Sequence, residues 1–202
     1  RIKSPAEIEY MQKASTIGSK AHRFAMERAT PGMGEWEIQS NIEGFFMNSK
    51  SNWSFPSIVG GGGNATVLHY KSNDCIVKEG DLVLLDAGCE VNGYASDITR
   101  TWPISGKFTE PQKEIYELVL KAEKAGINAC QVGAPWSKMH RVVSEIIAQG
   151  LIDLGILDCD LQQALGDEIN LDGPFRNFFM HGTGHLLGLD VHDVGGGRQG
   201  DP

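Results

Sequence analysis

Apolar residues recur at helical spacing near the start of the chain, at Ile8, Met11, Ala14, Ile17, Ala21 and Ala25. This spacing places an apolar stripe along one side of a helix, which then packs against a core. Residues 4–7, Ser-Pro-Ala-Glu, form a capping box with proline at the first helical position, so they predict where the helix begins. We expect the helix to run to about Ala29, because Pro31 and Gly32 follow.

A second helix and four strands are predicted next. From Glu35 onward the apolar positions again have helical spacing, at Ile38, Ile42, Phe45 and Phe46. Residues 57–59 and 66–70 have the character of strands, and the glycines at 60–63 between them predict a hairpin with a wide turn. Residues 81–101 predict another hairpin, because Asn92-Gly93 is the dipeptide that most favours a tight type I′ turn.

The helical pattern then appears a second time. Residues 109–112, Thr-Glu-Pro-Gln, repeat the capping signature and predict a helix whose inward residues are Ile115, Leu118, Val119 and Ala122. A fourth helix should follow Pro135. A shift of 101 residues superimposes the two helix pairs and indicates an internal duplication, although any two amphipathic helix pairs match to some extent. Strands should then follow the second pair as well, in residues 178–193, which predicts an α+β fold of two sheet-and-helix halves.

Length and charge narrow the class of protein. The chain has 202 residues, enough for one compact domain with a full core. It carries 18 basic and 26 acidic side chains, a net charge of −8, and the acids are dispersed, so nucleic acid is an unfavourable partner. No apolar run approaches the roughly 20 residues of a membrane span, and the first residues lack the apolar core of a secretory signal. We expect a soluble, cytoplasmic protein with no membrane partner, whose four cysteines are reduced thiols.

Two aspartates in the second predicted hairpin are the first candidates for chemistry. Pairing across Asn92-Gly93 places Asp97 opposite Gly88 and diagonally across from Asp86, so both carboxylates leave one face, roughly 7 to 8 Å apart at the backbone. The missing side chain of Gly88 leaves room between them. Because an unpaired buried carboxylate is unfavourable, the pair needs a cation. Either Arg100 or a lysine pairs with one acid while solvent covers the other, or a metal binds; the opposite parity of Arg100 favours the metal.

Three of the six histidines lie close together, at His181, His185 and His192. His181 and His185 have the spacing of a zincin helix, but glycines at 182 and 184 disfavour a helix and the glutamate of that motif is absent. The glycines instead predict close approach of the backbone to a ligand. Each histidine alone is compatible with a structural role; together with the two aspartates, they predict that at least one binds a metal. Carboxylates with one imidazole suit Mn²⁺, Co²⁺ or Zn²⁺, and a carboxylate can bridge two ions about 3.5 to 4 Å apart that hold a hydroxide.

These segments resemble the pita-bread metallopeptidases, the family of aminopeptidase P, prolidase and methionine aminopeptidase. The motifs that carry the resemblance are LDAGCE at 85–90, GYASDITRT at 93–101 and HGTGHLLG at 181–188. Three more are similar to the Xaa-Pro aminopeptidase branch: PSIVG at 56–60, LHY at 68–70 and GLDVHD at 188–193. The resemblance covers essentially the whole chain. It implies an α+β pita-bread fold with a pseudo-twofold repeat and two divalent ions, Mn²⁺ with Co²⁺ or Zn²⁺ as alternatives.

The same resemblance assigns roles to six residues. It implies that Asp86 is a terminal ligand of one metal, that Asp97 bridges the two ions and that His185 binds the other. It also implies that three histidines line the active site, where they hold the substrate and stabilise the tetrahedral intermediate: His69, His181 and His192.

The function that the resemblance implies is that of an Xaa-Pro aminopeptidase. Such an enzyme acts on a peptide with proline at the second position and removes the residue before it. One alternative is a prolidase, which cleaves only Xaa-Pro dipeptides. Another is a peptide-binding module of the same fold without catalysis, which would be expected to lose ligands that this chain keeps.

Two features differ from the family pattern. Leu186 stands where many members of the branch have tryptophan, which bears on the choice between aminopeptidase and prolidase. The family also has an amino-terminal domain and completes its metal site with two glutamates on later strands, none of which lies within residues 1–202. We therefore expect residues 1–202 to be a C-terminally incomplete part of a catalytic domain, inactive by itself. Its exposed sheet edge would favour self-association or pairing with another segment, so a homo-oligomer is a further expectation.

Overall fold

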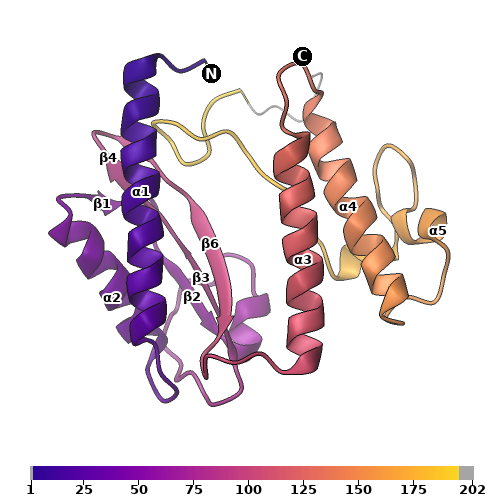
Figure 1. The fold of residues 1–202 in the computed structure, drawn as a ribbon, viewed down its shortest axis with the longest axis horizontal. Helices are drawn as coiled ribbons and strands as arrows, with labels where there is room; N and C mark the ends of the chain where they lie inside the picture. Colours follow the sequence, from indigo (N-terminus) through magenta and orange to yellow (C-terminus); the bar gives the residue numbers. More distant parts are fainter. Residues whose placement is uncertain (1, 196–202) are drawn as a thin grey trace. The chain divides into compact units, whose positions relative to one another are not determined.

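The computed structural model describes residues 2–195, which form two compact units (Figure 1). The first unit comprises residues 2–108 and 185–195, and the second comprises residues 109–184. Each unit has a hydrophobic core of its own. The division between them falls where the repeated helix pair predicts the second half to begin. That residues 1–202 belong to one catalytic domain stays a prediction.

Both predicted helices of the first unit are present. Helix α1 spans Pro5–Arg28 and begins at the predicted capping box, in which the Ser4 hydroxyl accepts from the N–H of Glu7 and the Glu7 carboxylate accepts from the N–H of Ser4. Helix α2 spans Glu35–Asn48. Its apolar stripe faces the core: Ile38, Ile42 and Phe46 are fully buried, and Phe45 is partly buried.

Within the described residues, six strands form two antiparallel three-stranded sheets. The first contains β2 (Ile58–Gly61), β3 (Leu82–Ala87) and β6 (Ile98–Pro103), with β3 at the centre. The second contains β1 (Asn52–Trp53), β4 (Cys89–Val91) and β5 (Tyr94–Ala95), with β4 at the centre. Helix α1 packs against β4, β5 and β6, and α2 packs against β1 and β2, so the core lies between helices and sheets.

The hairpin around Asn92-Gly93 has the predicted register. Asn92 and Gly93 have φ angles of 51° and 82°, as a type I′ turn requires. Glu90 pairs with Ala95 next to the turn, and farther along Asp86 pairs with Thr99. Asp97 lies two residues before the partner of Asp86, which is the diagonal position that the sequence predicted.

The hairpin predicted from residues 57–70 is wrong. Strand β2 pairs with β3 instead, and the residues after it form the 3₁₀ helix η1 (Gly62–Thr66) and a loop. Gly62 has a φ of +56°, so the chain turns out of the strand as soon as the sheet ends. On the edge of β2 away from β3, the Asn73 side-chain oxygen accepts from the N–H of Val59. A side chain thus occupies part of the edge that residues 66–70 would have paired with.

The second unit is helical in the described residues. Helices α3 (Glu110–Ala129) and α4 (Trp136–Asp153) pack against each other, and α5 (Leu161–Leu165) and the 3₁₀ helix η2 (Pro174–Asn177) pack on α4. The predicted start of α3 is confirmed, since the Thr109 hydroxyl accepts from the N–H of Gln112. Buried apolar residues form the core, among them Val143, Ile147, Ala148, Leu151 and Phe175.

The predicted inner face of α3 is only partly right. Ile115 and Val119 are 39% and 51% exposed, although their spacing placed them beside the buried Ala122. Helix α4 contacts the side of α3 that carries Gly126 together with Leu118 and Ala122, two of the predicted inward residues. A Cβ atom at Gly126 would lie 2.8 Å from the Val143 side chain. The close approach at this glycine fixes which side of α3 is covered.

The strands predicted in residues 178–193 are absent from the described structure. A strand needs a neighbour for its N–H and carbonyl groups. The backbone bonds here are mostly local, such as the N–H of Asp193 to the carbonyl of Leu186, and the carbonyl of Gly188 accepts a single bond from the N–H of Ala95. Isolated bonds of this kind hold an irregular segment without forming a ladder.

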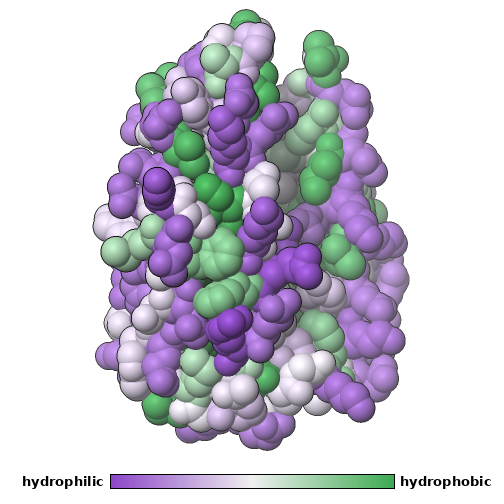
Figure 2. Space-filling view, turned by 60° about the vertical axis from the view of Figure 1, so that its left-hand side comes forward, coloured by the Kyte–Doolittle hydropathy of each residue, from purple (hydrophilic) through white to green (hydrophobic). Residues whose placement is uncertain are grey.

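The surface agrees with the dispersed charge of the sequence. Hydrophilic residues predominate on the face shown in Figure 2, and apolar residues are interspersed among them. None of the helices in residues 2–195 combines the length and the apolar character that crossing a membrane requires.

Candidate active site

Asp86 lies in β3, the central strand of its sheet. Burial alternates along this strand: Val83, Leu85 and Ala87 are fully buried in the core, and the residues between them, including Asp86, face the other side and are partly buried. The strand pattern therefore places one carboxylate on the face of the sheet that does not form the core. Aspartate is disfavoured in strands, so its presence at the centre of a sheet calls for a specific partner.

The environment of Asp86 opposes a negative charge. Its Oδ1 atom is buried and has no hydrogen-bond partner among residues 2–195. Burial and, secondly, the nearby charge of Asp97 raise the pKa of Asp86 to about 6, while the Thr99 hydroxyl and the charge of His69 lower it in part. A buried carboxylate oxygen without a partner, next to a second carboxylate, fits a site for a cation.

Asp97 immediately precedes β6, and its side chain is 23% exposed. The alternative of an ion pair with Arg100 is not realised, because Arg100 lies opposite Leu85 and donates to the carbonyl of Thr99. Among the ion pairs of the described residues, no lysine or arginine pairs with Asp86 or Asp97.

Glycine is needed at position 88 for a different reason from the one that the sequence suggested. A Cβ atom at this position would lie 1.7 Å from the carbonyl oxygen of Ser96 and 2.6 Å from the Ser54 hydroxyl. The glycine therefore permits the backbones of the two hairpin strands to approach each other, next to Asp97, rather than leaving a gap between the carboxylates.

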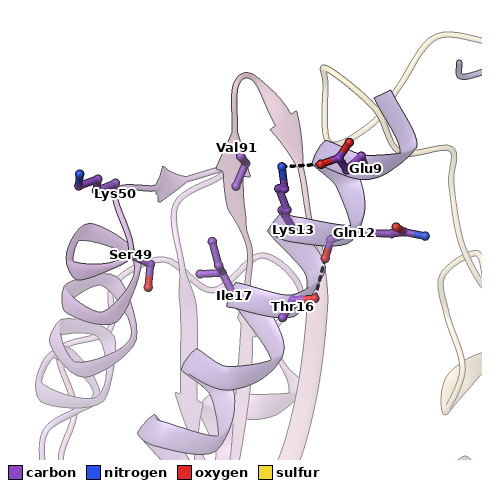
Figure 3. A pocket seen from close by; sticks show the side chains of 8 residues that line it. All are labelled: Glu9, Gln12, Lys13, Thr16, Ile17, Ser49, Lys50 and Val91. Atoms are coloured by element: carbon purple, nitrogen blue, oxygen red, sulfur yellow. Dashed lines mark hydrogen bonds and ion pairs between the residues drawn. The ribbon is translucent and has the colours of Figure 1, made fainter. Parts of the chain in front are cut away.

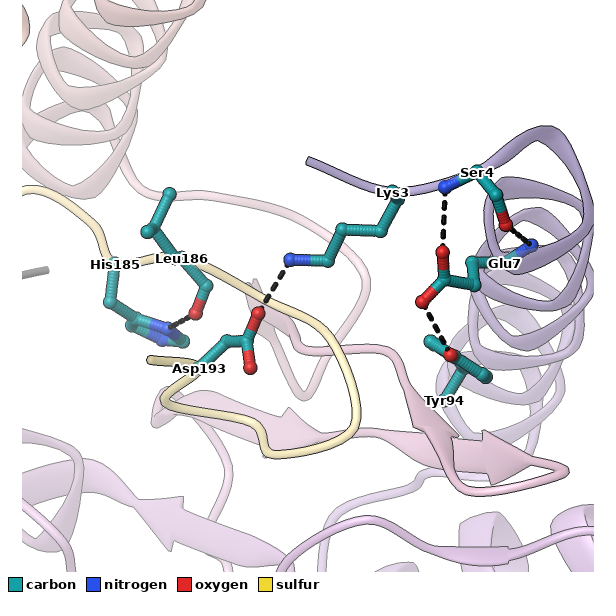
Figure 4. A network of polar contacts seen from close by, with 7 residues as sticks. All are labelled: Lys3, Ser4, Glu7, Tyr94, His185, Leu186 and Asp193. Atoms are coloured by element: carbon teal, nitrogen blue, oxygen red, sulfur yellow. Dashed lines mark hydrogen bonds and ion pairs between the residues drawn. The ribbon is translucent and has the colours of Figure 1, made fainter. Parts of the chain in front are cut away.

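His185 is paired with Asp97. Its Nε2 atom lies 2.9 Å from Oδ2 of Asp97. Its Nδ1 atom lies 2.9 Å from the carbonyl oxygen of Leu186 (Figure 4). Because a carbonyl only accepts, Nδ1 donates to Leu186, which fixes the ring with Nε2 toward Asp97. The ring of His192 stacks on that of His185, with centroids 3.9 Å apart. Two of the predicted histidines thus lie beside the second aspartate.

The segment that carries these histidines is held by polar contacts (Figure 4). The Lys3 ammonium pairs with the Asp193 carboxylate, and the side chains are only 15% and 10% exposed. Next to this pair, Tyr94 donates to the carboxylate of Glu7, which also caps α1. At Gly188 a Cβ atom would lie 2.6 Å from Oδ2 of Asp193, so this glycine allows the segment to fold back on itself.

The other two predicted histidines are placed differently. His69 is exposed in the loop after η1 with a φ of +53°, and it lies near enough to Asp86 for its charge to lower the pKa of that carboxyl. His181 belongs to the second unit, where its Nδ1 atom contacts the carbonyl of Gly182 and its ring meets Phe179 edge-on at 5.2 Å. That His181 lines the same site as Asp86 stays a prediction.

Asp86, Asp97 and His185 form a row in which the middle residue contacts both others. Asp97 affects the ionisation of Asp86 on one side and contacts His185 on the other. A carboxylate between two further ligands is the arrangement that bridging of two ions requires. The residues present therefore fit a site for divalent metal.

Glu35 is an acid that the sequence interpretation missed. In the part of the chain that the structure describes, Glu35, Asp74 and Cys75 are the one group of three ligand-type residues whose donor atoms lie within 4.8 Å of one another. Both Glu35 oxygens already accept hydrogen bonds from N–H and O–H groups, so the carboxylate of Glu35 is not free to bind a metal. In the sequence, Glu35 has the position of an ordinary acidic residue in the first turn of a helix, and no local pattern indicates that it is buried.

An open pocket of about 440 Å³ lies elsewhere on the first unit (Figure 3). Residues of α1 and β4 and the two residues that follow α2 line it, including Ile17, Ser49 and Val91, and the Lys13–Glu9 ion pair lies at its wall. None of the six predicted site residues lines this pocket. This pocket is therefore separate from the candidate site, which is identified from its side chains alone.

Comparison with known proteins identifies the family. Residues 9–201 match the model of metallopeptidase family M24. The chain belongs to this family. The Xaa-Pro aminopeptidase of Haemophilus influenzae is 49% identical over 96% of the chain and 44% of its own length. The Xaa-Pro aminopeptidase of Escherichia coli is 44% identical over 96% of the chain and 43% of its own length.

Solved structures of aminopeptidases share the fold. Aminopeptidase PepP of Pseudomonas aeruginosa matches with a TM-score of 0.87 and 40% identity, over 96% of this chain and 43% of that one. Zinc-substituted aminopeptidase P of E. coli in complex with product matches with a TM-score of 0.90 and 43% identity, over the same shares. These matches confirm the predicted pita-bread α+β fold and the class of metallopeptidase. The chain spans less than half the length of the relatives that it matches.

Proposed function

We propose that this chain is part of an Xaa-Pro aminopeptidase, which hydrolyses the bond between an amino-terminal residue and a following proline. Relatives named Xaa-Pro aminopeptidase that are 44% and 49% identical over nearly the whole chain support this proposal. The single observation that carries it is the row formed by Asp86, Asp97 and His185, because it combines a carboxylate that has one buried oxygen without a partner with two further ligand-type groups.

The proposed cofactor is a pair of divalent ions, Mn²⁺ in the first place. Asp86 would bind one ion, His185 the other, and Asp97 both. When bound, such a pair lowers the pKa of a water molecule and polarises the scissile carbonyl. The hydrogen bond from Nδ1 of His185 to Leu186 orients the ring for this role, as ligand histidines usually require.

The proposed roles of the remaining histidines concern the peptide. His192 stacks on His185 and so lies beside the ligand row, where it could donate a hydrogen bond to the developing oxyanion. His69 lies near enough to Asp86 for its charge to lower the pKa of that carboxyl. We assign His69, His181 and His192 to binding the peptide and stabilising the tetrahedral intermediate. From the sequence we also propose a cytoplasmic location. We further propose that residues 1–202 self-associate, and size-exclusion chromatography of these residues tests that proposal.

The test uses the full-length natural protein with Mn²⁺ and three peptides: an Xaa-Pro-Xaa tripeptide, an Xaa-Pro dipeptide and an Xaa-Ala-Xaa tripeptide. The proposal expects release of the first residue from the Xaa-Pro tripeptide and no release from the alanine peptide. Cleavage of the dipeptide alone would make the protein a prolidase. Peptide binding without any cleavage, and with fewer than two ions per chain, would make it a non-catalytic module.

A further inference from the structure

Residues 62–75 form the irregular segment that presents His69, and its conformation is not held by a strand ladder. His69 is exposed and has a positive φ, a conformation that costs free energy in a residue with a side chain. Something outside the loop must therefore fix it if His69 is to keep one position near Asp86. The inference below rests on the proposed function.

The carboxylate of Glu35 is fully buried and holds both ends of this segment. Its Oε1 atom accepts from the N–H of Gly61 at 2.8 Å and from the side chain of Asn64 at 3.0 Å. Its Oε2 atom accepts from the hydroxyl of Tyr70 at 2.9 Å and from the N–H of Cys75 at 3.0 Å. One side chain from the first turn of α2 thus fixes the loop before, beside and after His69.

Tyr70 is the contact nearest to His69 in the chain. Its hydroxyl donates to Glu35 and accepts from the Asn64 side chain at 3.0 Å, so it connects the two halves of the segment. Burial and the Glu35 carboxylate raise the pKa of Tyr70, which keeps the hydroxyl protonated as a donor. Because residues 69 and 70 are adjacent, fixing the Tyr70 ring limits the motion of the His69 backbone directly.

Asn73 provides a second, independent anchor. It accepts from the N–H of Val59 in β2 and donates to the carbonyl of Ser57 and to Gln39 of α2. This anchor holds the end of the segment on the sheet even without Tyr70. Removal of the Tyr70 hydroxyl should therefore loosen the part that carries His69 without unfolding the whole segment.

We propose that Glu35 and Tyr70 are positioning residues that hold His69 at the candidate metal site. Neither touches the row of Asp86, Asp97 and His185; they act through the loop. The proposal differs from a general structural role in one respect: the effect of losing the Tyr70 hydroxyl should depend on whether a histidine is present at position 69.

The test is a double-mutant cycle in the full-length protein, with Y70F, H69A and the double variant. Y10F is the matched control, because Tyr10 loses the same hydroxyl on α1, where its ring stacks on Tyr94. Y70F should lower kcat by about tenfold with little change in KM, and in the H69A background it should have less than a twofold effect. Y10F should change kcat by less than twofold, and all variants should keep the metal content of the wild-type protein.

Amide hydrogen exchange provides a readout that does not need activity. In Y70F, but not in Y10F, amides of residues 67–75 should exchange faster, while those of β3 should not change. E35Q should have the larger effect on exchange, because the glutamine side chain would place an N–H₂ group among four donors. Should E35Q fail to fold, Y70F carries the test.

The outcomes separate the two proposals. If the wild-type protein is active and Y70F lowers kcat equally in the wild-type and H69A backgrounds, or does not lower it at all, the positioning role is overturned. The proposed function then still stands. Unchanged exchange in residues 67–75 of Y70F would overturn it as well. A full-length wild-type protein that releases nothing from an Xaa-Pro tripeptide would overturn the proposed function, and the positioning role for that reaction with it.

Discussion

Replacing Asp86 by asparagine should stabilise the metal-free chain at neutral pH. The wild-type carboxyl has a pKa raised from its usual 3.8 to about 6, first by burial and then by Asp97, so ionising it disfavours the folded state. One pKa unit corresponds to about 1.4 kcal/mol, so the difference amounts to at most about 3 kcal/mol. Asparagine has nearly the same shape and no charge, and D86N should therefore recover part of this free energy.

The effect has a defined dependence on pH. Between about pH 4 and pH 6 the folded state holds the Asp86 proton more tightly than the unfolded state, so wild-type stability falls as the pH rises through this window. Above about pH 6 the penalty is complete, and below about pH 4 it is absent. The advantage of D86N should accordingly be largest at pH 7 to 8 and should vanish near pH 4.

Urea unfolding in the presence of a chelator measures this difference by tryptophan fluorescence. Three of the four tryptophans, Trp36, Trp53 and Trp102, lie in the first unit, so the signal reports mainly on the unit that contains Asp86. Added Mn²⁺ should reverse the order, because only the wild-type chain keeps the carboxylate ligand. A D86N chain that is less stable than wild type at pH 8 without metal, by an amount that does not change at pH 4, would refute the reasoning.

Three further predictions concern neighbouring residues. G88A should lower the free energy of unfolding by about 3 kcal/mol or more, since its Cβ would lie 1.7 Å from a carbonyl oxygen; an unchanged urea midpoint would contradict this. In the full-length protein, D97A should lose both ions and all turnover. H192A should keep its metal, and its kcat should fall by about 100-fold or more. Metal analysis and peptide kinetics of both variants test these outcomes. K3A removes the cation that lowers the pKa of Asp193, so it should be less stable than wild type at pH 7, and the difference should shrink as the pH falls below about 4; an equal loss at pH 3 in urea titrations argues against it.

Signals confined to a few neighbouring residues predicted structure well. The capping boxes at Ser4 and Thr109 mark the starts of α1 and α3, because the bonds that define a helix start lie within four residues. The Asn92-Gly93 turn set the register of the hairpin, and the register alone placed Asp97 diagonal to Asp86. Two site residues were thereby brought together from the sequence without knowledge of the rest of the fold.

Features that depend on distant residues were not predictable in this way. Residues 66–70 have the composition of a strand, but the side chains of Asn73 and Glu35 accept from the backbone N–H groups around them, those of Val59, Gly61 and Cys75. Those contacts join residues 14 to 40 positions apart, and no local pattern records them. The absence of strands in residues 178–193 has a similar origin, because a strand exists only where a second strand is available to pair with it.

At the candidate site, several residues depart from the conformations and surroundings that their residue types prefer. Asp86 stands in a central strand, His69 adopts a positive φ, and an oxygen of Asp86 is buried without a partner. Each of these departures lowers the stability of the metal-free protein, and the Thr99 hydroxyl and the charge of His69 offset only part of the Asp86 term. A bound ion offsets the Asp86 term, since a ligand at about 100 times its Kd contributes about 2.7 kcal/mol, close to the cost of the buried charge. Metal binding and folding of the first unit should therefore be linked: the same carboxylate that weakens the empty fold is the one through which an ion stabilises it.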